Sequence, residues 1–156
     1  MCQALHDLDR LVYCFGPATV ISSTLKTNRH YINVEDEAHI ELEFPNNIKC
    51  SFDADTISAQ AWTGKTTIEG AKGNIILNSE FTPEWFVTDF PKPKANEENY
   101  EPDIKPRYYG PCHGLIIDNF IDAIITKRQP LVSGESTLAT LKVLFEIYQK
   151  ANKNQN

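Results

Sequence analysis

The sequence lacks the long apolar segments that membrane and secreted proteins carry. No apolar run approaches the roughly 18 residues that a membrane-spanning helix needs. The first ten residues read MCQALHDLDR, and no basic segment is followed there by an apolar one, as a secretory signal requires. We therefore expect a cytoplasmic protein that has no membrane partner.

Basic residues are also in short supply. Fifteen Lys and Arg residues stand against twenty-one Asp and Glu residues, which gives a formal net charge of −6. Only Lys127 and Arg128 form a basic cluster. Nucleic-acid phosphates repel an acidic surface unless basic residues are gathered on one face, so we expect no nucleic-acid partner.

Cysteine is sparse and shows no Cys-x-x-Cys pair; the four cysteines are Cys2, Cys14, Cys50 and Cys112. Because their spacing is irregular and the chain is not short and loop-rich, we expect reduced thiols rather than disulfides. Cys2 and His6 are the one pair at helical spacing, which falls short of the two tight pairs usual in a zinc site. We therefore expect no bound metal, and Cys14 and Cys50 fit the pattern of small buried hydrophobes.

Glycine is too scattered to form a phosphate-binding loop. The seven glycines include no G-x-G spacing, and the sequence contains no P-loop, G-x-S-x-G or H-E-x-x-H motif. Dinucleotide-binding proteins hold the pyrophosphate at a helix N-terminus that follows such a glycine-rich turn. We expect this chain alone to bind neither NAD nor NADP.

What the sequence does contain fits one domain over residues 1–156. Hydrophobic residues make up 41% of the chain, and a chain of this length can bury a sizeable core. Residues 2–15 predict a helix that ends before Gly16 and Pro17, because four apolar residues recur on one side: Leu5, Leu8, Val12 and Phe15. The abrupt start of this helix leads us to expect that the chain is part of something longer.

Residues 19–90 alternate with a period of two, which predicts strands at residues 19–25, 37–44, 48–54, 66–69, 74–77 and 85–90. Prolines and charges predict a long exposed loop over residues 91–106. Two helices follow, one over residues 115–127 and one after a capping Ser133. Segregated strands and helices predict an α+β fold, a mostly antiparallel, open-faced sheet of six strands with helices packed on one face.

His6 is the leading candidate for chemistry. It lies on the side of the first helix away from the apolar stripe, and Asp9 follows within reach of the imidazole. A histidine oriented by a carboxylate is a common proton-transfer group near neutral pH. Spacing alone favours a plainer interpretation, a structural histidine between helix and sheet. For His113, spacing alone likewise favours a loop histidine beside the start of a helix.

A series of short motifs also runs along the chain. In chain order they are residues 3–9 (QALHDLD) with 15–16 (FG), residues 35–36 (ED), residues 68–73 (IEGAKG), residues 113–124 (HGLIIDNFIDAI) and residues 130–135 (PLVSGE). In type and order they resemble the QAxHxxD…FG, ED, IxGxxG, HxxxIxDFxxAI and PxVxGE motifs of the sugar and inositol dehydrogenases. This is the glucose–fructose oxidoreductase, inositol 2-dehydrogenase and MocA family (Gfo/Idh/MocA), and the resembling region is its C-terminal domain.

The resemblance implies a substrate-binding and oligomerisation domain of an NAD(P)-dependent dehydrogenase that acts on a sugar or polyol. An N-terminal Rossmann domain, absent from this chain, would bind NAD or NADP and supply a catalytic lysine. His6 would lie at the catalytic cleft, near the substrate hydroxyl that loses its proton. Many members have an Asp where Cys2 stands, whereas Gln3 matches a subgroup.

We expect the substrate-facing wall to draw on six residues: Gln3, Asp9, Gln60, Trp62, Tyr109 and His113. A rival interpretation is a non-catalytic binding or scaffolding protein that kept the fold, and Cys2 in place of the acid favours it. The reading frame upstream of Met1 discriminates the two. A strand–GxGxxG–helix unit in that frame supports the enzyme, and a genuine start codon at Met1 supports the scaffold.

The strand pattern also predicts self-association. Three helices can cover only one face of a six-stranded sheet, because a helix is about 10 Å wide and strands lie about 4.8 Å apart. The uncovered face would include small and aromatic residues after the third strand: Ile57, Ala59, Ala61 and Trp62. We expect a homodimer or a higher homo-oligomer through this open sheet face.

Overall fold

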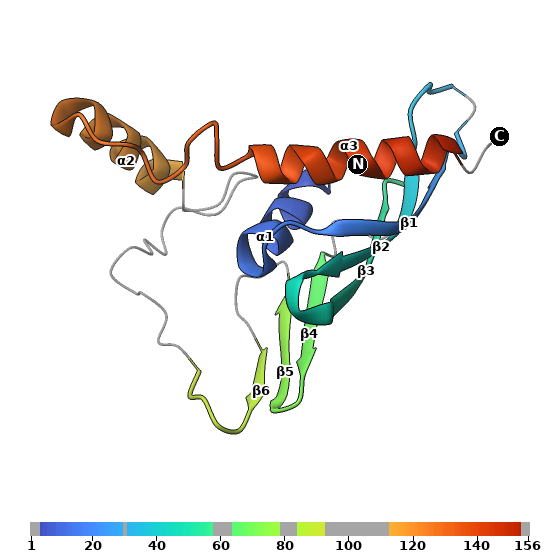
Figure 1. Cartoon of the computed structure of the whole chain (residues 1–156), viewed down its shortest axis with the longest axis horizontal. Helices are drawn as coiled ribbons and strands as arrows, with labels where there is room; N and C mark the ends of the chain where they lie inside the picture. Colours follow the sequence, from blue (N-terminus) through green and yellow to red (C-terminus); the bar gives the residue numbers. More distant parts are fainter. Residues whose placement is uncertain (1–3, 30, 58–63, 79–83, 93–112, 154–156) are drawn as a thin grey trace. The chain divides into compact units, whose positions relative to one another are not determined.

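A computed structural model of the chain describes residues 4–29, 31–57, 64–78, 84–92 and 113–153 (Figure 1). The chain divides into two compact units, one formed by Met1–Ile57 with Leu115–Asn156 and one by Ser58–Gly114. Each unit contains an antiparallel sheet of three strands. The predicted α+β class with open antiparallel sheets is confirmed. The described strands, however, form two sheets rather than one sheet of six.

Helix α1 (Leu5–Phe15) forms where the apolar stripe predicted it. Its buried side consists of Leu8, Leu11 and Val12. Gly16 ends the helix at a φ of 89°, in the left-handed region that glycine adopts readily, and donates its N–H to the Val12 carbonyl at 2.9 Å. The polar side of α1 is left free of the core and carries the predicted site residues.

Strands β1 (Thr19–Lys26), β2 (Glu37–Phe44) and β3 (Ile48–Asp55) pair in that order to form the sheet of the first unit. Four alternate residues of β2 are buried: Ala38, Ile40, Leu42 and Phe44. The hairpin between β2 and β3 turns through Pro45–Asn47, where Asn46 and Asn47 adopt φ values of 65° and 60°. Asparagine tolerates this conformation better than most residues, which fits its use in the turn.

Strand β1 contains a β-bulge that the period-two pattern did not predict. Val20 pairs with Leu42 and Ser22 pairs with Glu41, so Ile21 is the extra residue. Helix α3 (Leu138–Lys153) packs along β1 and bonds its backbone at the bulge. The Glu146 carboxylate accepts a hydrogen bond from the Val20 N–H at 3.4 Å, and the Lys150 ammonium donates to the Val20 carbonyl.

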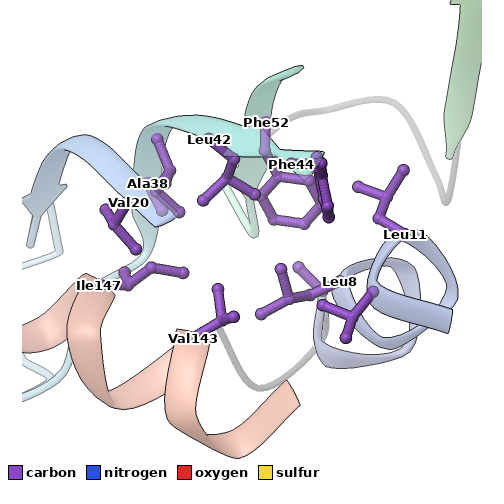
Figure 2. Packing of buried hydrophobic residues seen from close by; sticks show 12 residues of the cluster. Leu8, Leu11, Val20, Ala38, Leu42, Phe44, Phe52, Val143 and Ile147 are labelled. Atoms are coloured by element: carbon purple, nitrogen blue, oxygen red, sulfur yellow. The ribbon is translucent and has the colours of Figure 1, made fainter. Parts of the chain in front are cut away.

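The core of the first unit lies between the sheet and two helices (Figure 2). Its largest fully buried apolar side chains are Leu8, Ile40, Leu42, Ile147, Val20 and Val143. Figure 2 shows Leu8 of α1 and Val143 and Ile147 of α3 directed toward the side chains of the strands. Packing of α1 and α3 on one face of the sheet is therefore as predicted. Ser133, predicted to cap α3, instead accepts a hydrogen bond from the Ser136 N–H at 3.2 Å in a turn before it.

The second unit contains β4 (Lys65–Gly70), β5 (Gly73–Asn78) and β6 (Glu84–Val87), again in sequential order. The turn between β4 and β5 follows the predicted GxxG hairpin. Gly73 has a φ of 129°, and a Cβ atom added there would fall on the carbonyl oxygen of Phe86 in β6. A side chain at this position is excluded both by the backbone conformation and by the close approach of the neighbouring strand.

Helix α2 (His113–Thr126) corresponds to the predicted helix but differs from it in packing. Seven of its apolar residues are at least 46% exposed: Leu115, Ile116, Ile117, Phe120, Ile121, Ile124 and Ile125. The helix is hydrogen-bonded to the loop that follows it, where the Arg128 N–H donates to the Ala123 carbonyl at 3.0 Å. The sequence predicted that this helix would bury its apolar side against the sheet, and these exposures contradict that. None of the helices in the described ranges is long and apolar enough to cross a membrane.

Candidate functional site

The polar side of α1 presents His6 to solvent. His6 is exposed, and Tyr13, seven residues later on the same side of the helix, is also exposed. Neither side chain belongs to the core formed by Leu8, Leu11 and Val12. The placement of His6 off the apolar stripe is therefore as the spacing predicted, and the imidazole is available to a ligand.

Asp9 joins α1 to α3. The hydroxyl of Thr140, which is only 3% exposed, donates to the Asp9 carboxylate at 2.5 Å. A hydrogen bond to an ionised acceptor at such a distance is among the stronger ones in proteins. The sequence placed Asp9 within reach of the His6 imidazole. The bond to Thr140 fixes the turn of α1 that carries His6 against α3.

Of the other predicted site residues, only His113 lies among those that the structure describes. Gln3, Gln60, Trp62 and Tyr109 lie outside the described residues, as do Cys2 and Cys112. His113 is exposed at the first residue of α2 and belongs to the second unit. His6 and Asp9 are thus the two predicted site residues that the structure brings together on one element.

A network around Asp36 orders the loop between β1 and β2. The Asp36 side chain is 3% exposed and accepts hydrogen bonds from the Asn28 N–H at 2.8 Å and the Arg29 N–H at 2.9 Å. These bonds, led by that from the Asn28 backbone, hold the pKa of the Asp36 carboxyl below its ordinary value. Next to it, the Tyr148 hydroxyl of α3 donates to the Glu35 carboxylate at 2.6 Å. The ED pair was the only sequence signal for this network.

The face of the first sheet that points away from the helices is polar. Its centre is His39, whose Nδ1 lies 2.5 Å from an Asp53 carboxylate oxygen and whose Nε2 lies 3.3 Å from Glu41. The hydrogen bond to Asp53 and its charge raise the pKa of His39. Further acidic residues flank this group on β2 and β3: Glu37, Glu43 and Asp55. Of the small and aromatic residues expected beyond β3, Ile57 is partly exposed, and Ala59, Ala61 and Trp62 lie outside the described residues.

The two described cysteines are free thiols. Cys50 is half-buried, and burial raises the pKa of its thiol. Cys14 is exposed, so its interpretation as a buried hydrophobe is wrong. It lies beside the stripe of core residues on α1 and outside it. Across the described residues no group of three or more His, Cys, Asp or Glu side chains is arranged to hold a metal ion.

The comparison with protein families agrees with the motifs. Residues 1–76, which include α1 and the first sheet, match the family described as GFO/IDH/MocA C-terminal domain. The resemblance drawn from the short motifs is thereby confirmed. A comparison with curated protein sequences found no match.

Solved structures share the fold of this chain. The WlbA dehydrogenase of Bordetella pertussis, determined with NADH and UDP-GlcNAcA, is 22% identical with a TM-score of 0.77, covering 97% of this chain and 42% of its own. The WlbA dehydrogenase of Chromobacterium violaceum, determined with the same ligands, is 24% identical with a TM-score of 0.77. The match covers 99% of this chain and 44% of the WlbA chain. The aldose-aldose oxidoreductase of Caulobacter crescentus, complexed with glycerol, is 20% identical with a TM-score of 0.70. The match covers 97% of this chain and 44% of the oxidoreductase chain. The chain thus spans less than half the length of these relatives.

Proposed function

We propose that this chain is the substrate-binding and oligomerisation domain of a cytoplasmic NAD(P)-dependent oxidoreductase that acts on a sugar or polyol. The family match over residues 1–76, which contain the exposed His6 on α1, carries the proposal. Relatives of the same fold support it, since their structures hold NADH with a nucleotide sugar or, in one case, glycerol.

His6 is the proton-transfer residue in this proposal. Oxidation of a sugar hydroxyl to a carbonyl removes a hydride from carbon and a proton from oxygen, and NAD or NADP supplies the hydride acceptor. The His6 imidazole takes the hydroxyl proton, a role that histidine commonly fills in enzymes. The described residues offer no glycine-rich turn before a helix, so the cofactor would be held mainly by the Rossmann domain outside this chain.

The bond between Asp9 and Thr140 makes Asp9 a positioning residue. It fixes α1 against α3 and so sets the direction in which His6 points. The remaining wall of the substrate site is proposed to come from the residues named by the sequence: Gln3, Gln60, Trp62, Tyr109 and His113. Aromatic, amide and imidazole groups of this kind suit a ligand that is rich in hydroxyl groups.

The test of His6 uses the complete enzyme and two variants of α1, His6→Ala and Cys14→Ser. Candidate substrates are UDP-activated hexuronic acids and free aldoses, each offered with NAD and with NADP. His6→Ala should lower turnover by about 10²–10⁴-fold, the usual contribution of a general base, while the melting temperature stays close to that of the wild type. Cys14→Ser changes an exposed side chain of the same helix and should leave both unchanged. Wild-type turnover in His6→Ala would show that His6 is structural.

The cofactor part of the proposal has its own test. Calorimetry of the 156-residue chain with millimolar NAD or NADP should give no saturable heat, because the sequence contains no G-x-G turn. A micromolar Kd for either dinucleotide would contradict the assignment of cofactor binding to another domain.

Association through the open sheet face is the last part of the proposal. The face combines acidic side chains with His39 and with two lysines, Lys26 and Lys49, so a two-fold axis can set unlike charges opposite each other. Light scattering at micromolar concentration should give about 35 kDa, twice the 17.7 kDa of one chain. A monomer mass that persists over a hundredfold range of concentration would mean that this face is simply solvated.

A further inference from the structure

His39, at the centre of the open face of the first sheet, has a carboxylate beside each of its two ring nitrogens. Its Nδ1 lies 2.5 Å from an Asp53 oxygen, and its Nε2 lies 3.3 Å from a Glu41 oxygen. A neutral imidazole has one N–H and can donate to only one of these acceptors, whereas the imidazolium donates from both nitrogens. The side chain is half exposed, so it exchanges protons with solvent. The geometry therefore favours the charged form of the ring.

The open face around His39 carries an excess of negative charge. Residues that pair directly across neighbouring strands lie on the same face of a sheet, so the strand registers identify its members. Besides His39, the face holds five carboxylates and two ammonium groups: Glu37, Glu41, Glu43, Asp53, Asp55, Lys26 and Lys49. Its formal charge is therefore −3 when the imidazole is neutral and −2 when it is protonated.

Both strands that flank β2 contribute to the surroundings of His39, while α1 and α3 pack on the opposite face of the sheet. On β3, Asp53 stands directly opposite His39. On β1, the residue opposite is the uncharged Thr24, and the charged residue of the strand is Lys26, whose ammonium is paired with a neighbouring carboxylate at 2.7 Å. Asp53 and, to a smaller extent, Glu41 raise the pKa of His39, while desolvation and the charge of Lys26 lower it.

A second copy of this chain suits the face because the two signs of charge are arranged asymmetrically on it. Lys26, Glu37 and Asp55 form one row across the three strands, with the lysine at one edge and the aspartate at the other. A two-fold axis along β2 places Lys26 of one copy opposite Asp55 of the other. The same axis brings the two His39 rings to the centre of the contact, with the Asp53 carboxylates of both copies beside them.

Protonation of His39 decides whether two such faces attract or repel each other at that centre. With neutral rings, the carboxylates of both copies meet without a positive charge between them, and like charges set against each other oppose association. With protonated rings, each imidazolium can lie between carboxylates of both copies, and each face loses one unit of net negative charge. Histidine changes its charge near neutral pH, so the contact should respond to pH in that range.

We propose that the open face of the first sheet is a pH-sensitive contact for a second copy of this chain, and that protonation of His39 tightens it. The proposal rests on the proposed function, which includes association through this face, and adds the group that regulates it. Because carboxylates of both copies favour the imidazolium, the dimer holds its two protons more firmly than the separate chains do. Association should therefore be strongest below about pH 6.5 and weaken as the pH rises through the pKa of His39 in the dimer.

Sedimentation equilibrium of the 156-residue chain at about pH 6 and at about pH 8.5 tests the proposal. One low ionic strength is used throughout, because salt screens exposed charges. If each ring prefers the protonated state about threefold more strongly in the dimer, the two rings together make the Kd about tenfold lower at the lower pH. Circular dichroism at both pH values checks that the chain stays folded.

Three variants separate His39 from other effects of pH. His39→Gln stays neutral and should keep the weaker Kd at both pH values. His39→Arg stays positive and should keep the tighter Kd at both. His6→Gln removes a histidine from α1, which packs on the opposite face of the sheet, and should associate as the wild type does. This last variant shows whether the loss of any histidine has the same effect.

Two results would overturn the proposal while leaving association itself in place. One is a wild-type Kd that is the same at both pH values, and the other is an undiminished pH effect in His39→Gln. A monomer at every pH and concentration would overturn it together with the association part of the proposed function. Turnover of the complete enzyme and its loss in His6→Ala are measured separately, so a failure of the oxidoreductase assignment is recognised independently of these results.

Discussion

Two residues on opposite sides of α3 give a sharp test of its packing. Ile147 is 0% exposed and lies in the core, whereas Phe145, two positions earlier, points away from it. Truncating a fully buried isoleucine removes transfer energy and leaves a cavity, so Ile147→Ala should lower the free energy of unfolding by about 2–5 kcal/mol. For a chain of this length that corresponds to a fall of roughly 4–20 °C in the melting temperature.

Phe145→Ala removes a larger side chain but should have a much smaller effect in the 156-residue chain. About two thirds of Phe145 is already in water, so truncation loses only the covered part of its transfer energy, about 1 kcal/mol or less. The higher helix propensity of alanine offsets about half of that loss. Ile147→Ala, the smaller truncation, should therefore destabilise the chain more than Phe145→Ala.

Circular dichroism at 222 nm is the suitable assay, because α1, α3 and nearly all of α2 belong to the first unit. Thermal and urea unfolding of the wild type and both variants are compared at one concentration. Equal losses for Ile147→Ala and Phe145→Ala, or a larger loss for Phe145→Ala, would refute the assignment of inner and outer sides.

Two further predictions concern the sheets. Gly73→Ala should destabilise the second unit by more than about 1 kcal/mol, since the new Cβ meets the Phe86 carbonyl at a φ of 129°. Gly134→Ala, at a site with open space, is the control, and tryptophan fluorescence during urea unfolding is the measurement. The pKa of His39 is raised in the folded chain, so its bond to Asp53 stabilises the fold fully below about pH 6.5, the ordinary pKa of histidine. This stabilisation is lost as the pH rises through the pKa of His39 in the folded state. The stability difference between wild type and Asp53→Asn should therefore shrink toward alkaline pH, and a difference that is constant from about pH 5 to 9 would contradict it.

The local elements were predictable because each depends on a short sequence period. The alternation in residues 37–44 needed one buried face, and β2 buries Ala38, Ile40, Leu42 and Phe44. The stripe on α1 likewise placed His6 in solvent. The same helical spacing places Cys14 away from the core, and the error came from treating cysteine by its average burial instead of its position on the helix.

Interactions between distant segments left little signal in the sequence. Thr140 is 131 residues from Asp9, and no period links a hydroxyl on one helix to a carboxylate on another. The bulge at Ile21 is similar, because it is held by Glu146 and Lys150 of α3 rather than by anything in β1. The placement of the site therefore depends on tertiary contacts, even though its leading residue, His6, was identified from one helix.

Helix α2 shows that a hydrophobic pattern does not identify the partner that buries a helix. A row of apolar residues indicates that one side of a helix must be buried, but the row is the same whether the partner is a sheet of the same domain or another domain. The expected partner was the sheet, and the exposed Ile117, Phe120 and Ile124 contradict that prediction. On α3 the two sides separate, because Ile147 is buried by this chain and Phe145 is not. The hydrophobic pattern therefore shows that these sides of α2 and α3 are apolar, but it does not identify what covers them.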